Sequence, residues 1–227
     1  MRNTAINIDG EQVPGYISLP PSGSGPGVIV VQEWWGLVPH IVDVTDRLAA
    51  EGFVALAVDL YRGVETTEPD EAQKLMLGLD IAEMADDMAG AAYDLLERPE
   101  VAGSGVGVVG FCMGGGLALL APTVSDHITT AVAFYPAMPW PHYAPDWTRF
   151  TGKAAEIHKA ASDEASNGPR IAEYAEAIAA SGGTVELFDY PDSVHAFFND
   201  ARPEVYQAAN SELAWQRTLD FFRDRLG

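Results

Sequence analysis

Short, continuous apolar runs alternate with amphipathic helical segments along almost the whole sequence. The runs VIVV at 28–31, VALAV at 54–58 and GVGVVGF at 105–111 have the length of strands and carry no charged residue. Strands that are apolar on both sides are typical of a mostly parallel sheet covered by helices on both faces and joined by right-handed crossovers. The pattern therefore predicts an α/β protein.

The expected elements follow one another from about residue 3 to residue 225 without an internal repeat or an interdomain linker. We therefore expect a single domain over 1–227. The elements are a hairpin over 3–20 with its turn at Asp9 and Gly10, strands beginning near 28, 53, 105, 129 and 184, a candidate strand over 153–160, and helices near 40–51, 69–97 (one or two helices), 114 onward, 170–181 and 204–225.

Acidic residues outnumber basic ones by 33 to 13, which gives a formal net charge of -20. Such a chain repels phosphate backbones and anionic lipids, so we expect neither a nucleic-acid partner nor a membrane partner. The first twenty residues lack the apolar core of a signal peptide, and no later stretch approaches 18 uninterrupted apolar residues. We expect a soluble, cytoplasmic protein.

Cys112 is the only cysteine of the sequence. It excludes an internal disulfide and a cluster of thiolate metal ligands, and we expect no metal and no cofactor. A lone cysteine is most often a small buried hydrophobic residue, so the presence of a single cysteine does not by itself indicate a function.

The surroundings of Cys112 are more informative, because it is the centre of the G-x-C-x-G segment from Gly110 to Gly114. A nucleophile on a sharp turn between a strand and a helix needs neighbours without Cβ, so that strand and helix can pack closely. The following helix N-terminus also favours a thiolate. The alternative G-x-G-x-x-G loop at 105–110 fits poorly, because the turn residues AGSG precede it and its valines form the strand.

A cysteine nucleophile needs a base and a group that orients the base. His195 follows the last predicted strand, and Asp163 follows the preceding one, in the chain order nucleophile, acid, histidine. Glu164 stays open as an alternative acid. For the other histidines that we considered, His40, His127 and His142, we expect exposed surface positions.

Five segments in order resemble the dienelactone hydrolases, an α/β-hydrolase family with a Cys-His-Asp triad. They are VVQEWWG, VALAVDLYRG, VGVVGFCMGGGLAL, IHKAASDEA and YPDSVHAFFNDARPEVY, and the resemblance spans about residues 5 to 225. It implies an α/β-hydrolase fold with a minimal lid or none. It also implies Cys112 as nucleophile, His195 as general base and then acid, and Asp163 as the orienting carboxylate.

The same resemblance implies that Glu33 helps to generate the thiolate when substrate rearranges the site. It implies an oxyanion hole made by the backbone N–H groups of Trp34 and Met113. Substrate contacts are expected from Trp35, Arg62, Phe111 and Tyr135, of which Phe111 and Tyr135 follow the ends of strands.

The sequence departs from the family where arginines bind the substrate's carboxylate. One expected arginine is replaced by Asn199, and the other is missing from the segment TTEPDEAQKLM. Arg62 and Arg202 lie near these positions in the sequence and are candidates to replace them. This departure leaves the identity of the substrate open, while the expected hydrolysis is unchanged.

These features predict a hydrolase that cleaves a carboxylic ester or lactone through a thioester intermediate. The alternative is a non-catalytic protein that binds a small molecule on the same scaffold, and nicotinamide-dependent reduction is the weakest reading. The expected partner is a small ester or lactone, and the expected state is a monomer or small homo-oligomer.

Overall fold

The computed structural model describes all residues except 1, 9, 139, 141–142 and 164–167. Glu164, His142 and Asp9, each named in a prediction above, lie outside the described residues. The elements are β1 Thr4–Ile8, β2 Glu11–Ser18, β3 Gly25–Val31, α1 Pro39–Ala50, β4 Val54–Val58, α2 Pro69–Leu77, α3 Ile81–Leu96, β5 Val101–Phe111, α4 Met113–Val124, β6 Ile128–Phe134, η1 Trp147–Phe150, β7 Ala154–Ala160, α5 Gly168–Ala180, β8 Thr184–Tyr190 and α6 Ala208–Leu226.

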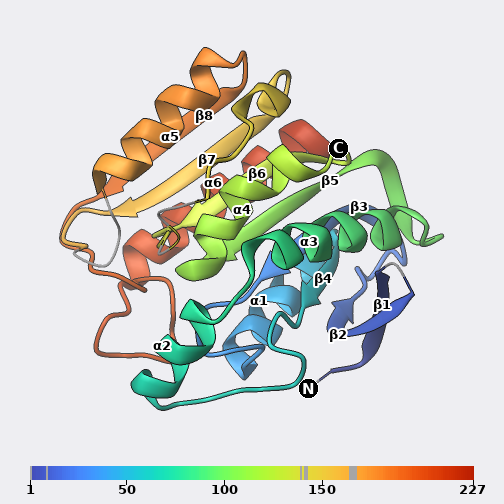
Figure 1. Ribbon diagram of the computed structural model, residues 1–227, viewed down its shortest axis with the longest axis horizontal. Coiled ribbons are helices and arrows are strands. Elements are labelled where there is room, and N and C mark those ends of the chain that lie inside the picture. Colours follow the sequence, from blue (N-terminus) through green and yellow to red (C-terminus); the bar gives the residue numbers. More distant parts are fainter. Residues whose placement is uncertain (1, 9, 139, 141–142, 164–167) are drawn as a thin grey trace.

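The strands form one sheet of eight in the order β1-β2-β4-β3-β5-β6-β7-β8, counted over the described part of the chain (Figure 1). β1 and β2 pair in antiparallel fashion, as the hairpin prediction requires, and β2 is antiparallel to β4. All pairs from β4 to β8 are parallel. The prediction of a mostly parallel sheet is therefore confirmed, and the candidate strand over 153–160 is β7.

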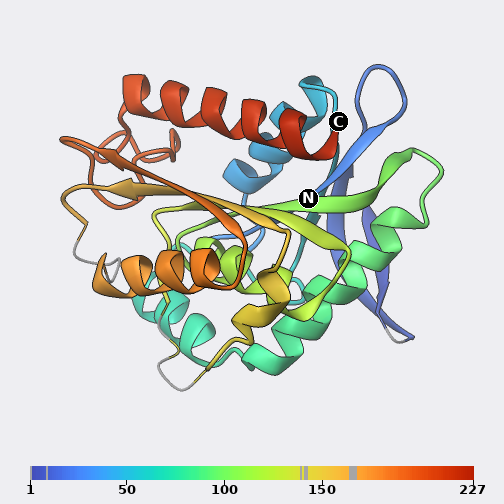
Figure 2. The same ribbon diagram turned by 90° about the horizontal axis from the view of Figure 1, so that it is seen from above.

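Helices cover the sheet on both faces. Figure 2 shows α1 and α6 on one face and α3, α4 and α5 on the other. The central strands are accordingly buried on both sides, with β4 and most of β3, β5 and β6 inaccessible to solvent. Burial of these apolar side chains is the main favourable contribution to folding.

Strand β5 begins earlier than the sequence suggests. The AGSG segment, expected to be a turn, lies inside the strand because Gly25 pairs with Val101 and Pro26 with Ala102 before the register shifts. The glycines of the G-x-G-x-x-G pattern at 105–110 therefore stand within a strand. A phosphate-binding loop needs them in a turn after the strand, so this arrangement excludes that reading.

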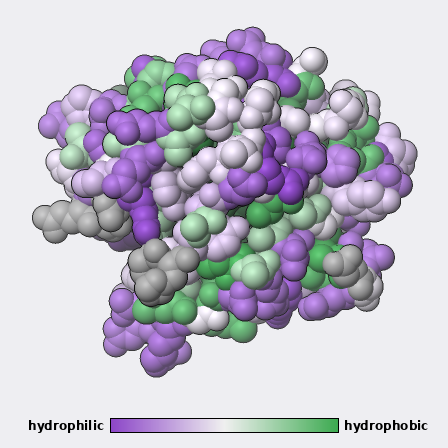
Figure 3. Space-filling view, turned by 45° about the horizontal axis from the view of Figure 1, so that its top comes forward, coloured by the Kyte–Doolittle hydropathy of each residue, from purple (hydrophilic) through white to green (hydrophobic). Residues whose placement is uncertain are grey.

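The visible surface is largely hydrophilic. On the face shown in Figure 3, hydrophilic residues (purple) cover much of the surface, and hydrophobic residues (green) gather in a band between them. No helix in the described ranges combines the length and the apolar character needed to cross a membrane.

The junction between β5 and α4 is packed backbone against backbone. A Cβ on Gly110 would lie 1.9 Å from the carbonyl oxygen of Gly114, and a Cβ on Gly114 would lie 2.4 Å from the carbonyl oxygens of Val31 and Gln32. Real Cβ atoms do not approach so closely. The two glycines flanking Cys112 are therefore required by packing, as the sequence motif predicts.

We expect Gly110→Ala to lower the free energy of unfolding by about 1–3 kcal/mol, because strand and helix must separate to admit the methyl group. Urea denaturation of the two proteins measures the difference. Gly168→Ala is a matched control, since its Cβ would make only an ordinary 3.7 Å contact with Lys159. Equal stability of Gly110→Ala and the unaltered protein would contradict the packing argument.

Candidate active site

Cys112 occupies the sharp turn between β5 and α4. Its backbone has φ 57° and ψ -118°, a conformation that non-glycine residues rarely adopt. Hydrogen bonds hold it there: the Cys112 N–H donates to the carbonyl of Phe134 (3.1 Å), and its own carbonyl accepts from Ala137 (2.9 Å). The residue is 7% exposed and lines a cavity. Backbone strain at such a position is typical of a functional site.

The N-terminus of α4 adds a favourable electrostatic field. Met113 is the first residue of this helix, so its N–H has no partner within the helix. The first turn contains no acidic residue that would cancel the helix dipole. Cys112 thus stands at the N-terminus of the helix, where we expect a nucleophile.

His195 lies between Cys112 and Asp163. Its Nδ1 is 2.8 Å from Oδ2 of Asp163, and its ring lies close enough to Cys112 for the two groups to interact electrostatically. Burial alone would lower the pKa of His195. The interaction with a Cys112 thiolate and the hydrogen bond to Asp163 outweigh burial and raise the pKa of His195 to about 10. A protonated imidazole beside the sulfur stabilises a thiolate.

The loops that carry His195 and Asp163 are tied to each other and to α6. The Ser162 N–H donates to the carbonyl of Ser193 (3.1 Å), which joins the two loops. Asn210 on α6 donates to Ser193 Oγ (2.8 Å), and the Ser211 hydroxyl donates to the carbonyl of Phe197 (2.9 Å). These bonds fix the position of His195 from both sides.

Glu33 follows β3 and is only 1% exposed. Two neutral groups hold its carboxylate: the Tyr135 hydroxyl donates to Oε1 (3.3 Å), and the Asn199 amide donates to Oε2 (2.9 Å). Burial, followed by the charges of Glu33 and Cys112, raises the pKa of Tyr135 well above its usual range. Tyr135 therefore stays protonated and remains a donor to Glu33.

A cavity of about 230 Å³ brings these groups together. Five of the predicted site residues lie on its wall: Glu33, Trp34, Trp35, Cys112 and His195. The complete lining, as described, is Glu33, Trp34, Trp35, Met76, Cys112, Ala137, Met138, His195, Ala196 and Arg202. Trp34 and Trp35 meet edge to face, with ring centroids 4.9 Å apart.

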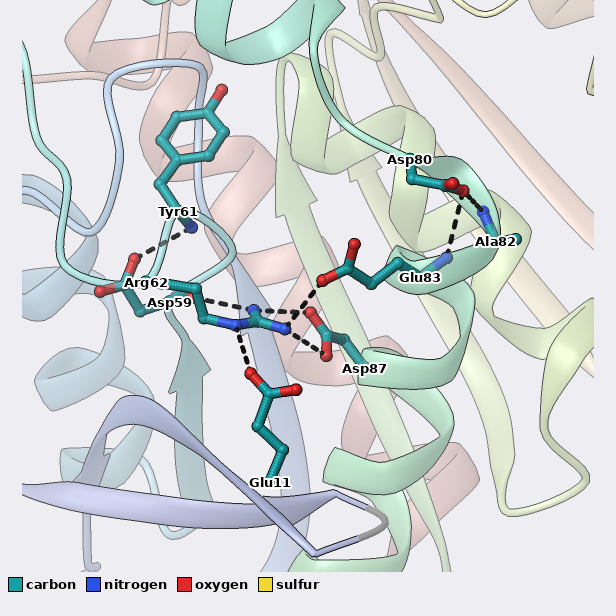
Figure 4. A network of polar contacts seen from close by, with 8 residues as sticks. All are labelled: Glu11, Asp59, Tyr61, Arg62, Asp80, Ala82, Glu83 and Asp87. Atoms are coloured by element: carbon teal, nitrogen blue, oxygen red, sulfur yellow. Dashed lines mark hydrogen bonds and ion pairs between the residues drawn. The ribbon is translucent and has the colours of Figure 1, made fainter.

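Arg62, expected to contact substrate, does not line this cavity. Its guanidinium forms a bidentate ion pair with Asp87 (2.8 and 2.9 Å) and further ion pairs with Glu11 and Glu83, both at 3.5 Å (Figure 4). It thus ties the loop after β4 to α3 and β2. The acidic residues nearby bind this arginine, and a contact between Arg62 and substrate stays a prediction.

Phe111 and Tyr135 are also absent from the described lining. Phe111 is fully buried and stacks on Phe134 and Phe198, with centroids 4.9 and 5.5 Å apart. Tyr135 is fully buried and contacts Glu33 instead of open space. Of the substrate contacts expected, Trp35 lies on the cavity wall.

Sequence reasoning missed three residues at the site. Asn199 was noted only as the replacement of an arginine, although its amide binds Glu33. Met76 and Met138 line the cavity, and no local pattern distinguishes them from core residues. Arg202, named as a candidate on its sequence position, does reach the cavity. In the described residues no group of three or more metal-ligating side chains comes together.

The chain has an α/β-hydrolase fold. Its strand order and its similarity to solved structures both support this assignment. The structure named "Putative Dienelactone Hydrolase" from Klebsiella pneumoniae superposes with a TM-score of 0.86 and 27% identity, covering 97% of this chain and 96% of that one. The family model for the dienelactone hydrolase family matches residues 13–226.

Two sequence relatives support the same assignment. "Protein usf" of Aquifex pyrophilus is 34% identical, and "Putative carboxymethylenebutenolidase" of Aquifex aeolicus is 31% identical; each match covers 96% of both chains. The chain belongs to the dienelactone hydrolase family and is a hydrolase.

The charge on His195 leads to a test of the site geometry. Because its pKa of about 10 keeps the imidazole protonated at neutral pH, we expect His195→Gln to slow alkylation of Cys112 by iodoacetamide about 10-fold or more at pH 7.5. Mass spectrometry measures the rate at the only cysteine of the chain. The exposed His127, changed to Gln, is the control and should leave the rate unaltered. A His195→Gln protein that reacts as fast as the control would disprove the pairing.

Proposed function

We propose that the protein hydrolyses a carboxylic ester or lactone, with Cys112 as the nucleophile. The observation that carries the proposal is the continuous chain of contacts from Cys112 through His195 to Asp163, at the wall of a cavity that also contains Glu33. Nucleophile, base and orienting acid in this order match the requirements of acyl transfer through a covalent intermediate.

In the first half of the reaction the thiolate attacks the carbonyl carbon, and the carbonyl π electrons move to oxygen. The backbone N–H groups of Trp34 and Met113 stabilise this oxyanion. When the tetrahedral intermediate collapses, the carbon–oxygen bond to the leaving group breaks. The alkoxide takes the proton from the His195 imidazolium and leaves a thioester on Cys112.

In the second half His195, now neutral, accepts a proton from water as the water attacks the thioester. Collapse of the second tetrahedral intermediate releases the carboxylic acid product and restores the thiolate beside the protonated imidazole. Asp163 keeps the Nδ1–H of His195 oriented throughout. Esters with good leaving groups suit this chemistry best, and amides suit it poorly.

The second candidate is a binding protein on the same scaffold that does not turn its ligand over. It predicts stabilisation by ligand without any thioester on Cys112. The contact between His195 and Cys112 favours the enzyme, because a binding site has no need of a protonated imidazole next to a thiol. The single domain over 1–227, the cytoplasmic location and the monomer or small homo-oligomer stay predictions.

We expect Cys112→Ala to reduce turnover of 4-nitrophenyl acetate by at least about 1,000-fold, because the nucleophile is lost. Release of 4-nitrophenol measures the rate, and mass spectrometry of a rapidly quenched reaction detects the acetyl thioester in the unaltered protein. Prior treatment with iodoacetamide should have the same effect as the substitution. Full activity after either change would reject the mechanism.

The role of Glu33 is tested by Glu33→Gln. A buried negative charge beside the sulfur disfavours the thiolate, so we expect the pH midpoint of Cys112 alkylation to fall. If Glu33 also accepts the thiol proton when substrate binds, the kcat of ester hydrolysis falls in the same variant. Glu68→Gln, at an exposed position, is the matched control. An unchanged alkylation profile and unchanged kcat would reduce Glu33 to a structural role.

A further inference from the structure

Apolar side chains form most of the wall of the candidate active-site cavity. In the described lining they are Trp34, Trp35, Met76, Ala137, Met138 and Ala196. The volume of about 230 Å³ is below the roughly 300–1,000 Å³ usual for small-molecule sites. The wall therefore favours a small apolar group.

Glu33 places a negative charge on this wall without a cation to balance it. The residue is 1% exposed, and its carboxylate accepts hydrogen bonds from Tyr135 and Asn199, which are both neutral. Asn199 stands where the resemblance leads us to expect an arginine. A carboxylate carried by the substrate would meet the charge of Glu33 away from water, where like charges repel more strongly than in solution.

Two residues of the described lining carry a positive charge, and both are already paired. His195 lies 2.8 Å from Asp163. The Arg202 guanidinium donates to Oε1 of Glu204 at 2.9 Å. The side chain of Glu204 is 61% exposed, so this ion pair lies on the solvent side of the cavity. A substrate carboxylate would have to compete with Glu204 for Arg202.

The segment 199–204, which brings Arg202 to the cavity, contains two acidic residues and one basic residue. Its second acidic residue, Asp200, lies with Oδ1 3.3 Å from Nδ1 of His40. The expectation of an exposed His40 was wrong, since the residue is only 5% exposed and its ring meets Phe111 and Phe198 edge to face. The charges of this segment thus add to the repulsion of an anion.

We propose that the cavity selects small, uncharged esters with an apolar acyl group and disfavours esters that carry a carboxylate. Glu204 is then a specificity-determining residue, because it occupies the guanidinium of Arg202. The inference rests on the proposed ester hydrolysis at Cys112 and specifies its substrate class. Arg202 does not act as a carboxylate-binding arginine while Glu204 is present.

The first test compares two 4-nitrophenyl esters of hexanedioic acid, in which the second carboxyl group is either free or methylated. One charge distinguishes the two acyl chains. At pH 7.5 we expect kcat/KM to be at least about 10-fold lower for the free acid, because an ionised carboxylate without a cationic partner is unfavourable in an apolar cavity. Uncatalysed hydrolysis is measured with Cys112→Ala and subtracted. A smaller difference, or a preference for the free acid, would overturn the proposal.

The second test concerns Glu204. Glu204→Gln removes the charge that occupies Arg202 and keeps the size of the side chain. We expect it to raise the kcat/KM ratio of the free acid to the methylated ester about 3- to 5-fold, in keeping with the strength of an exposed ion pair. Adding Arg202→Gln should abolish this gain. Glu212→Gln, at an exposed position on α6, is the matched control. An unaltered ratio in Glu204→Gln would refute the role of Glu204.

Protection of Cys112 from alkylation separates this inference from the proposed reaction, because it requires no turnover. Hexanamide and 6-amino-6-oxohexanoate have the same chain length, and end in a methyl group and a carboxylate respectively. We expect hexanamide to slow the alkylation of Cys112 by iodoacetamide at a lower concentration than its charged counterpart. This result supports the selection even if the unaltered protein hydrolyses no ester. Efficient hydrolysis of both hexanedioic esters, with equal protection by the two amides, would leave the proposed function intact and refute the selection.

Discussion

The close backbone contact between the end of β5 and the first turn of α4 is the constraint on which the site depends. Carbonyl oxygens already occupy the space that a side chain at Gly110 or Gly114 would need. Because strand and helix meet so closely, Cys112 adopts a positive φ, and its sulfur stands at the N-terminus of α4. In this turn the Cys112 N–H donates to the carbonyl of Phe134, and the Cys112 carbonyl accepts from the N–H of Ala137. The end of the neighbouring strand therefore also holds Cys112 in place.

The polar groups around the sulfur are divided into two systems. One is charged: His195 contacts Cys112 on one side and Asp163 on the other, and these partners keep its imidazole protonated against the effect of burial. In the other system two neutral side chains, Tyr135 and Asn199, donate to the two oxygens of the Glu33 carboxylate. The fold thus places a cation and a buried carboxylate on the same cavity wall while giving each its own partners.

The sequence predicted the order of strands and helices well, because the apolar runs of β3, β4 and β5 are buried on both faces and the helices are amphipathic. It also predicted the strand-end positions of Cys112, Asp163 and His195, since parallel strands end at one edge of the sheet. It did not predict the surroundings of Arg62 and His40, because these depend on contacts with residues distant in sequence, such as Asp87 and Phe198. No local sequence pattern indicates such contacts.

The isolation of Cys112 has a consequence for oxidative damage. The sequence contains no second thiol, so a sulfenic acid formed at this sulfur has no partner within the chain with which to condense into a protective disulfide. Recovery would have to come from a small external thiol that enters the cavity, and further oxidation to the sulfinic state would be irreversible. The low exposure of Cys112, at 7%, therefore both shields the sulfur from oxidants and slows its repair.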